Sequence, residues 1–250
     1  KKAALKIKKI SETNNIKIKG IGISAAGQID HNKGIVIGDN GFIPNWKGTN
    51  IKKELEEITE LDVIVNNDAN CAAIAEKWLG NGQDYNDLIV YTIGTGIGAG
   101  IILNNQLIYG KKGLAGEIGH MIINHQGKNC TCGNSGCFEQ YGSITALINE
   151  VKKNSNKKEE IIDGKYIFEE AKKGNKELLN YVKNFINYHC SAIISLIHIF
   201  NPEAIIIGGG VSLQKEYLIE PIRRIVKEKV MSAFLENFVL KTAKLSNEAG

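Results

Sequence analysis

The sequence predicts an α/β protein, and two observations support this prediction. Short apolar segments with the composition of buried strands alternate with longer segments of helical period. From Asp87 onward the chain opens a new unit of three short apolar segments, with glycine-rich or polar turns between them. We therefore expect two α/β lobes, residues 1–86 and residues 87–250.

The first lobe is predicted to begin with a helix over about residues 1–11. Residues 16–24 and residues 62–66 are predicted as buried strands, each preceded by a lysine- and glutamate-rich segment of helical period. After Asp68 a run of strong helix formers ends at Gly80, as a helix terminated by glycine should.

The second lobe is predicted to open with three strands, LIVYTIG, GAGIILN and QLIYG. Helical segments follow, then an apolar strand at 203–210 that ends in three glycines, and a last strand, FVLKTAKL. The first lobe has no equivalent opening hairpin, and the sequence starts on Lys-Lys rather than Met. If the two lobes are duplicates, the first β-hairpin is absent from this sequence, and we expect it to lie beyond the N-terminal end.

Composition narrows the class of protein. A chain of 250 residues with 43% hydrophobic and 23% charged residues can bury a real core. It has no membrane-span run and no signal-peptide pattern, so we expect a soluble, cytoplasmic protein with no membrane partner. The net charge of +4 is carried almost entirely by lysine, and the only arginines are Arg223 and Arg224. Because bidentate readout of bases or phosphates favours arginine, a nucleic-acid partner is not expected.

Three of the five cysteines lie within eight residues and predict a metal site. His120, Cys130, Cys132 and Cys137 supply one imidazole and three thiolates, which match the closed tetrahedral shell of structural zinc. Independent thiols or a disulfide are the alternatives. Four protein ligands leave no open position for water, so the metal would be architectural. It would hold Glu117, His120 and Glu139 around a pocket.

Two glycine-rich segments are candidate phosphate sites. Gly94, Thr95 and Gly96 begin a turn between two strands, where glycines permit positive φ and close approach of backbone N–H groups to an anion. The segment lacks the pattern of a P-loop or of a dinucleotide fingerprint. Gly208, Gly209 and Gly210 end a strand ahead of a helix, at the sheet edge where α/β proteins bind ligands. A purely structural turn is the alternative for both segments.

Asn67 and Asp68 lie where a predicted strand ends and a helix begins. Asp68 could be only the N-cap of that helix. The pair could also offer a hydrogen-bonding edge together with a carboxylate that accepts a proton from a hydroxyl. In phosphoryl transfer such a carboxylate need not be strongly basic, because positioning supplies most of the effect. Capping and catalysis are compatible.

Four motifs together resemble the ROK family of bacterial sugar kinases and sugar-responsive repressors. They are AGEIGH at 115–120, CTCGNSGCFE at 130–139, NDAN at 67–70 and GTGIG at 94–98. The resemblance covers about residues 21–210 and implies the two-lobed actin-like ATPase fold, which is ribonuclease H-like, with sugar and ATP meeting between the lobes. The family commonly forms dimers, so a homodimer is expected.

The resemblance also implies roles for individual residues. Asp68 would be the catalytic base for the sugar 6-hydroxyl. The sugar would further contact Gly27, Gln28, Asn67, Glu117, His120 and Glu139. ATP would be bound by Gly94, Thr95, Gly96, Gly208, Gly209 and Gly210, and zinc by His120, Cys130, Cys132 and Cys137. The family's first phosphate loop, Asp-x-Gly-Gly-Thr-Lys, whose aspartate helps hold Mg²⁺, has no counterpart in the sequence. We expect that it belongs to the missing hairpin.

The resulting hypothesis is a transferase, an ATP- and Mg²⁺-dependent kinase for the 6-hydroxyl of a hexose. Glucose, N-acetylmannosamine and a β-glucoside are the candidate substrates. One alternative is a sugar-sensing repressor with a DNA-reading domain upstream. The other alternative is a catalytically inactive sugar-binding protein.

Overall fold

The computed structural model describes residues 1–38, 43–154 and 162–245 and has the predicted α/β architecture. The strands are β1 (Ile21–Ala25), β2 (Gln28–Asp30), β3 (Ile35–Gly38), β4 (Val63–Asn67), β5 (Leu88–Ile93), β6 (Ile97–Leu103), β7 (Gln106–Leu107), β8 (Ala204–Gly208) and β9 (Val239–Thr242). The α-helices are α1 (Lys2–Thr13), α2 (Ile51–Thr59), α3 (Asp68–Trp78), α4 (Glu139–Gly142), α5 (Ile144–Asn154), α6 (Gly164–Lys172), α7 (Lys176–Phe200) and α8 (Glu220–Lys229). Shorter helical turns are η1 (Lys111–Gly113), η2 (Ile118–His120), η4 (Gly210–Leu213), η5 (Lys215–Ile219) and η6 (Ser232–Phe234).

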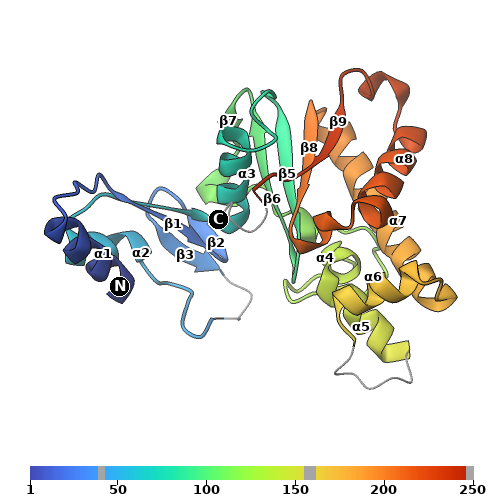
Figure 1. Ribbon diagram of the computed structural model, residues 1–250, viewed down its shortest axis with the longest axis horizontal. Helices are drawn as coiled ribbons and strands as arrows, with labels where there is room; N and C mark the ends of the chain where they lie inside the picture. The colour runs from blue at the N-terminus through green and yellow to red at the C-terminus, as the bar shows by residue number, and fades with distance from the viewer. Residues whose placement is uncertain (39–42, 155–161, 246–250) are drawn as a thin grey trace.

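The first half of the chain holds two small sheets beside helices α1 and α2 (Figure 1). Strand β1 pairs in parallel with β4, and β2 pairs antiparallel with β3. The apolar core of this half includes Ile29, Val36, Leu55, Val63 and Val65. Among the described residues, β1 has one hydrogen-bonded neighbour, in contrast to the central strands of the second half.

Two expectations for the first half are wrong. The strand predicted at 16–24 begins at Ile21 and is not buried, because Gly22 and Ser24 are exposed while Ala25 is buried. With a single neighbour in its sheet, β1 is covered only in part. The structure also contains two strands that were not expected, β2 and β3, which have three and four residues and are too short for a clear alternation of polar and apolar residues.

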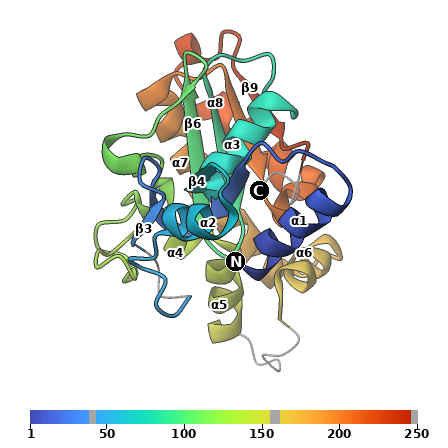
Figure 2. The same cartoon turned by 90° about the vertical axis from the view of Figure 1, so that its left-hand side faces the viewer.

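The second half is built on a five-stranded mixed sheet of order β7-β6-β5-β8-β9. The predicted strand-turn-strand unit is present as the antiparallel pair β5–β6, and β8 adds to β5 in parallel. Alternate residues of β5 face opposite layers: Ile89, Tyr91 and Ile93 join the core on the side of α7 and α8, while Leu88 and Val90 face α3. In Figure 2 α3 lies in front of this sheet, with α7 and α8 behind it.

Helix α3 joins the two halves. It starts directly after β4, and its body packs on β6 of the large sheet. This packing requires glycine, because a Cβ added at Gly98 would lie 2.9 Å from Ala69 Cβ and one at Gly100 would lie 2.4 Å from Ala73 Cβ. The helix therefore positions its first residue, Asp68, relative to both halves.

A buried carboxylate fastens the other end of α3. Glu76 is 1% exposed, and its Oε1 accepts hydrogen bonds from the backbone N–H groups of Lys244 and Leu245 at 2.9 and 2.8 Å. Its Oε2 accepts the N–H of Asn81 at 2.9 Å. Three backbone donors satisfy the buried charge, so α3 is tied to the segment after β9. Within the part of the chain described here, none of the helices is long and apolar enough to span a membrane.

Candidate active site between the two halves

Asn67 and Asp68 lie at the carboxyl end of β4, as predicted, but the helix cap is Asn67 rather than Asp68. The Asn67 Oδ1 accepts the backbone N–H groups of Ala69 and Asn70 at 2.9 and 3.2 Å. Its Nδ2 donates to the Gly27 carbonyl at 3.0 Å, which leaves a second amide hydrogen for a ligand. Asp68 is the first residue of α3, and its side chain is exposed. A carboxylate at a helix N-terminus is stabilised by the helix dipole.

Parallel pairing brings the predicted sugar loop next to Asp68. Ser24 pairs with Asn66 and Ala25 with Asn67, so the carboxyl ends of β1 and β4 meet at one edge. The chain turns back after β1 at Gly27, whose φ of 99° favours glycine. Gln28 follows as the first residue of β2.

Glu117 is the residue at which the predicted sugar contacts converge. Partial burial of its carboxyl raises its pKa, His120 lowers it, and the neighbouring carboxylates Glu139 and Asp68 raise it further. A hydrogen bond from the Gln28 side chain favours the charged form and lowers the pKa. These influences act over short range. Gln28, Asp68, His120 and Glu139, which come from four segments of the chain, therefore lie close enough to Glu117 to act on its carboxyl group.

The predicted metal ligands also come together. The ligand atoms of His120, Cys130, Cys132 and Cys137 all lie within 4.8 Å of one another. The Cys132 and Cys137 sulfurs are 3.5 Å apart, and the Cys130 sulfur lies 3.6 Å from His120 Nδ1. A tetrahedral zinc with bonds of about 2.3 Å separates its sulfur ligands by about 3.8 Å. The donor set and its spacing therefore fit zinc.

The cysteine loop is shaped by glycine and connects the metal ligands to Glu139. Gly136 has a φ of 79°, and a Cβ there would lie 1.6 Å from the Asn124 carbonyl oxygen. Phe138, which is fully buried, donates its N–H to the Met121 carbonyl at 2.8 Å. Glu139 then starts α4. The position of Glu139 thus depends on the fold of the cysteine loop.

The glycine turn after β5 is held by Glu139. Glu139 Oε2 accepts the backbone N–H of Ile97 at 2.9 Å, and Gly94 N donates to the Gly96 carbonyl at 3.0 Å. Thr95, at the tip of the turn, is exposed. Glycine permits positive φ, but none of the glycines in this turn adopts it. Close approach is the requirement at Gly96, where a Cβ would lie 2.4 Å from Glu139 Oε2.

The second glycine cluster lies beside the first. Strands β5 and β8 are parallel neighbours with Thr92 opposite Gly208, so the turn after β5 and the glycines after β8 leave the same sheet edge. Gly209 has a φ of 86°, and a Cβ there would lie 2.1 Å from the Ile93 carbonyl oxygen. Both predicted ATP segments therefore border one surface of the second half.

A family model for the ROK family matches residues 3–250. The chain belongs to the ROK family. The glucokinase of Thermotoga maritima is 33% identical over 241 residues, which cover 92% of this chain and 76% of that protein. A putative xylose repressor of Caldicellulosiruptor sp. is 33% identical over 244 residues, covering 93% of this chain and 60% of the repressor. The chain thus spans three-fifths of the repressor's length.

Solved structures agree with the family assignment. The crystal structure of a ROK family glucokinase from Streptomyces griseus, in complex with glucose and AMPPNP, matches this ROK chain with a TM-score of 0.82 at 30% identity. The match covers 98% of this chain and 84% of the glucokinase chain. The fold is the actin-like ATPase fold, as the sequence motifs implied.

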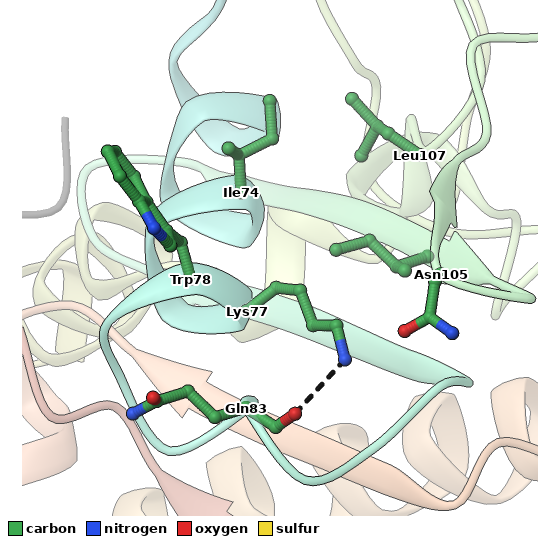
Figure 3. Close-up of a pocket in the computed structure, with 7 residues that line it drawn as sticks. Ile74, Lys77, Trp78, Gln83, Asn105 and Leu107 are labelled. Atoms are coloured by element: carbon green, nitrogen blue, oxygen red, sulfur yellow. Dashed lines mark hydrogen bonds between the residues drawn. The ribbon is translucent and has the colours of Figure 1, made fainter.

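A cavity of this ROK chain lies away from the predicted sugar site. It has a volume of about 440 Å³ and is at the far end of α3 from Asp68 (Figure 3). It is lined by Ile74, Lys77 and Trp78 of α3 and by Asn105 and Leu107, and Lys77 Nζ donates to the Gln83 carbonyl at 3.1 Å. The cavity shares no residue with the polar cluster around Glu117.

Sequence reasoning missed two residues next to the polar cluster. His31 belongs to none of the sequence motifs, and Tyr109 lies only in the predicted strand QLIYG. In the structure their rings stack with centroids 3.7 Å apart, and the Tyr109 hydroxyl accepts a hydrogen bond from Asn66. The residues are far apart in sequence and belong to no motif, so no local pattern could have identified them.

Proposed function

We propose that this chain is an ATP- and Mg²⁺-dependent hexose kinase that phosphorylates the 6-hydroxyl of glucose or a related sugar such as N-acetylmannosamine. The main support is the convergence of Asp68, Glu117 and His120, together with Gln28 and Glu139, on one location. Carboxylates, an imidazole and an amide are the groups that bind several sugar hydroxyls at once. The similarity to glucokinases supports the same proposal.

Each group has a role in the proposed reaction. Glu117, His120 and Asn67 hold the sugar hydroxyls, and Asp68 accepts the proton of the 6-hydroxyl as that oxygen attacks the terminal phosphoryl group. Thr95 and the glycine turn bind the ATP phosphates, while Gly208, Gly209 and Gly210 border the adenosine. ATP supplies the transferred group. For Mg²⁺ we assign no ligand within the described residues.

The zinc cluster has an architectural role in this proposal. Zinc would be held by His120, Cys130, Cys132 and Cys137, with no open coordination position. His120 would bind both zinc and sugar, and Glu139 directly follows the cysteine loop, so zinc would help to orient these two sugar contacts and would take no part in the proton transfer.

The decisive experiment is a hexose screen on the protein as its natural gene encodes it, with ATP and Mg²⁺. We expect turnover of at least one hexose. Asp68→Ala should lower kcat at least about a thousandfold while the sugar dissociation constant stays within a few-fold, because the proton acceptor is lost and the hydroxyl contacts remain. Unchanged turnover in Asp68→Ala would remove Asp68 from its role. We further propose a homodimer, which light scattering would test.

A sugar-responsive repressor is the second candidate, and the similarity to a xylose repressor favours it. A repressor would keep the sugar site and bind operator DNA through a separate domain. Sugar-dependent binding of the natural gene product to DNA, together with no phosphorylation of any hexose, would replace the kinase proposal by this one.

A further inference from the structure

Hydrogen bonds lead from Asn67, the residue directly before the predicted base, through Asn66 to a tyrosine of the other half. Asn66, directly before Asn67, is 7% exposed, and its Nδ2 donates to the Tyr109 hydroxyl at 3.0 Å. Its Oδ1 accepts the backbone N–H of Asn67 at 2.9 Å and the Nδ2 of Asn70 at 3.3 Å. The two donors Asn67 and Asn70 fix the Asn66 oxygen, and the Tyr109 hydroxyl is the acceptor that satisfies the Asn66 amide nitrogen.

The orientation of Asn66 matters for the next two residues. The Asn66 oxygen holds the peptide N–H of Asn67, and Asn67 in turn caps α3 and holds the Gly27 carbonyl. Asp68 follows within the same turn. A buried amide nitrogen without an acceptor is unfavourable, so removal of the hydroxyl would displace the Asn66 side chain and strain its bonds to Asn67 and Asn70.

The tyrosine ring is itself held in place. His31, just after β2, stacks on Tyr109 with an interplanar angle of 10°. The Tyr109 carbonyl accepts the N–H of Ala115 at 3.1 Å, two residues before Glu117. Gly113 lies against this region, since a Cβ there would be 2.5 Å from the Ile29 carbonyl oxygen. Tyr109 thus contacts the segment that carries Asp68 and the segment that carries Glu117.

We propose that Tyr109 is a positioning residue, whose hydroxyl acts through Asn66 to align Asp68 with the sugar bound at Glu117. This inference rests on the proposed kinase function. It assigns Tyr109 no contact with sugar or ATP. The stack with His31 fixes the Tyr109 ring between the segment that carries Asp68 and the segment that carries Glu117.

The test compares Tyr109→Phe with the wild-type protein by steady-state kinetics on the hexose found in the screen. Phe keeps the ring stack and removes only the hydroxyl. We expect kcat to fall about tenfold, while the sugar KM stays within about threefold and the melting temperature changes little, because misalignment affects the transferred proton more than ground-state binding. Tyr85→Phe is the matched control. The Tyr85 ring packs against Lys241, away from the proposed sugar site, so removal of its hydroxyl should leave kcat at the wild-type value.

A double-mutant cycle tests whether the hydroxyl acts through Asn66. The loss of kcat in Asn66→Ala/Tyr109→Phe should equal that of Asn66→Ala alone, since the hydroxyl then has nothing left to orient. Additive losses, or wild-type kcat in Tyr109→Phe, would contradict the positioning role and leave the kinase proposal standing. Wild-type protein that phosphorylates no hexose would contradict both. His31→Ala, which loosens the ring and keeps the hydroxyl, should lower kcat by a smaller factor than Tyr109→Phe.

Discussion

The carboxylate of Glu139 accepts the backbone N–H of Ile97 at 2.9 Å. One side chain thereby joins the proposed sugar site to the glycine turn proposed to hold the ATP phosphates. Hydrogen bonds to a charged acceptor are stronger than neutral ones. The bond between Glu139 and Ile97 would therefore hold the proposed sugar site and the proposed phosphate turn in a fixed relative position.

We predict that Gly96→Ala impairs catalysis without unfolding the protein. The added Cβ would lie 2.4 Å from Glu139 Oε2. This oxygen is the end of a flexible side chain, so it can move away from the new methyl group. The movement would break its hydrogen bond with the Ile97 N–H. Loss of a charge-assisted hydrogen bond of about 1.5–3 kcal/mol corresponds to a fall in kcat/KM of about tenfold to a hundredfold.

Kinetics with varied sugar and varied ATP, together with thermal melts, would measure this effect. Glu139→Gln keeps an amide oxygen for Ile97 and should lose less activity than Gly96→Ala. Equal kcat/KM in Gly96→Ala and wild type would show that the contact has no part in catalysis.

We predict that Cys132→Ser abolishes zinc binding. Three of four ligands remain, but a serine hydroxyl is a poor replacement for a thiolate. The backbone of Asn134 lowers the pKa of Cys132 to about 7, so this ligand reaches its thiolate form readily. Elemental analysis should find one zinc per chain in the wild-type protein and a large loss in the variant, accompanied by weaker sugar binding.

Cys71→Ser is the matched control for the zinc experiment, because Cys71 lies on α3 outside the cluster. It should retain a full equivalent of zinc. A wild-type protein without zinc, purified in the absence of chelators, would refute the metal assignment.

We predict an acid-sensitive core at His189. Its ring is fully buried beside Tyr91, Phe138 and Phe185, and burial lowers its pKa to about 3. Below the ordinary histidine value near 6.5 the unfolded state binds a proton that the native state does not. The unfolding free energy should therefore decrease as the pH falls from 6.5 toward 3, by about 1.4 kcal/mol per pH unit from this residue.

Denaturant unfolding at several pH values would measure this slope. His189→Asn, which keeps an acceptor for the Tyr91 hydroxyl, should be less stable than wild type near neutral pH but lose part of the pH dependence. His198→Asn removes an exposed histidine of the same helix and should keep the wild-type slope. Identical slopes in all three proteins would contradict the prediction.

We predict that Gly100→Ala destabilises the contact between α3 and the large sheet. The new methyl group would lie 2.4 Å from Ala73 Cβ and 3.0 Å from the Ala69 carbonyl oxygen, and both belong to the helix body. Neither can move without shifting α3, so overpacking should cost about 1–3 kcal/mol. Gly22→Ala is the control, since no atom lies within 4 Å of its added Cβ. Equal stability of the two variants would show that α3 can shift freely.

The elements with strong patterns could be predicted from the sequence. Strands β5, β6 and β8 are apolar runs bounded by glycine, and α3 follows a strand with a polar cap, so each was found within a few residues. The metal ligands were found because four donor side chains with this spacing are rare outside metal sites. The family motifs added the expectation that Asp68 and Glu117 share a site.

The remaining features depend on tertiary contacts that no local pattern encodes. Gly98 and Gly100 lie in a predicted strand, and nothing in the local sequence shows that they permit α3 to approach β6. Asn67, and not Asp68, caps the helix because β1 places the Gly27 carbonyl next to its amide. Each of these roles is set by residues that are distant in the chain.

Glu76 gives the C-terminal part of the chain an unexpected influence on the reaction centre. Two of its three backbone donors, Lys244 and Leu245, come after the last strand. Proteolytic removal of the residues after β9 would leave the buried Glu76 carboxylate without two of its three backbone donors. The helix that presents Asp68 would then lose its fixed contact at Glu76, about 12 Å along α3 from Asp68. A cut near the C-terminal end of the described chain would in this way disturb the proposed sugar site.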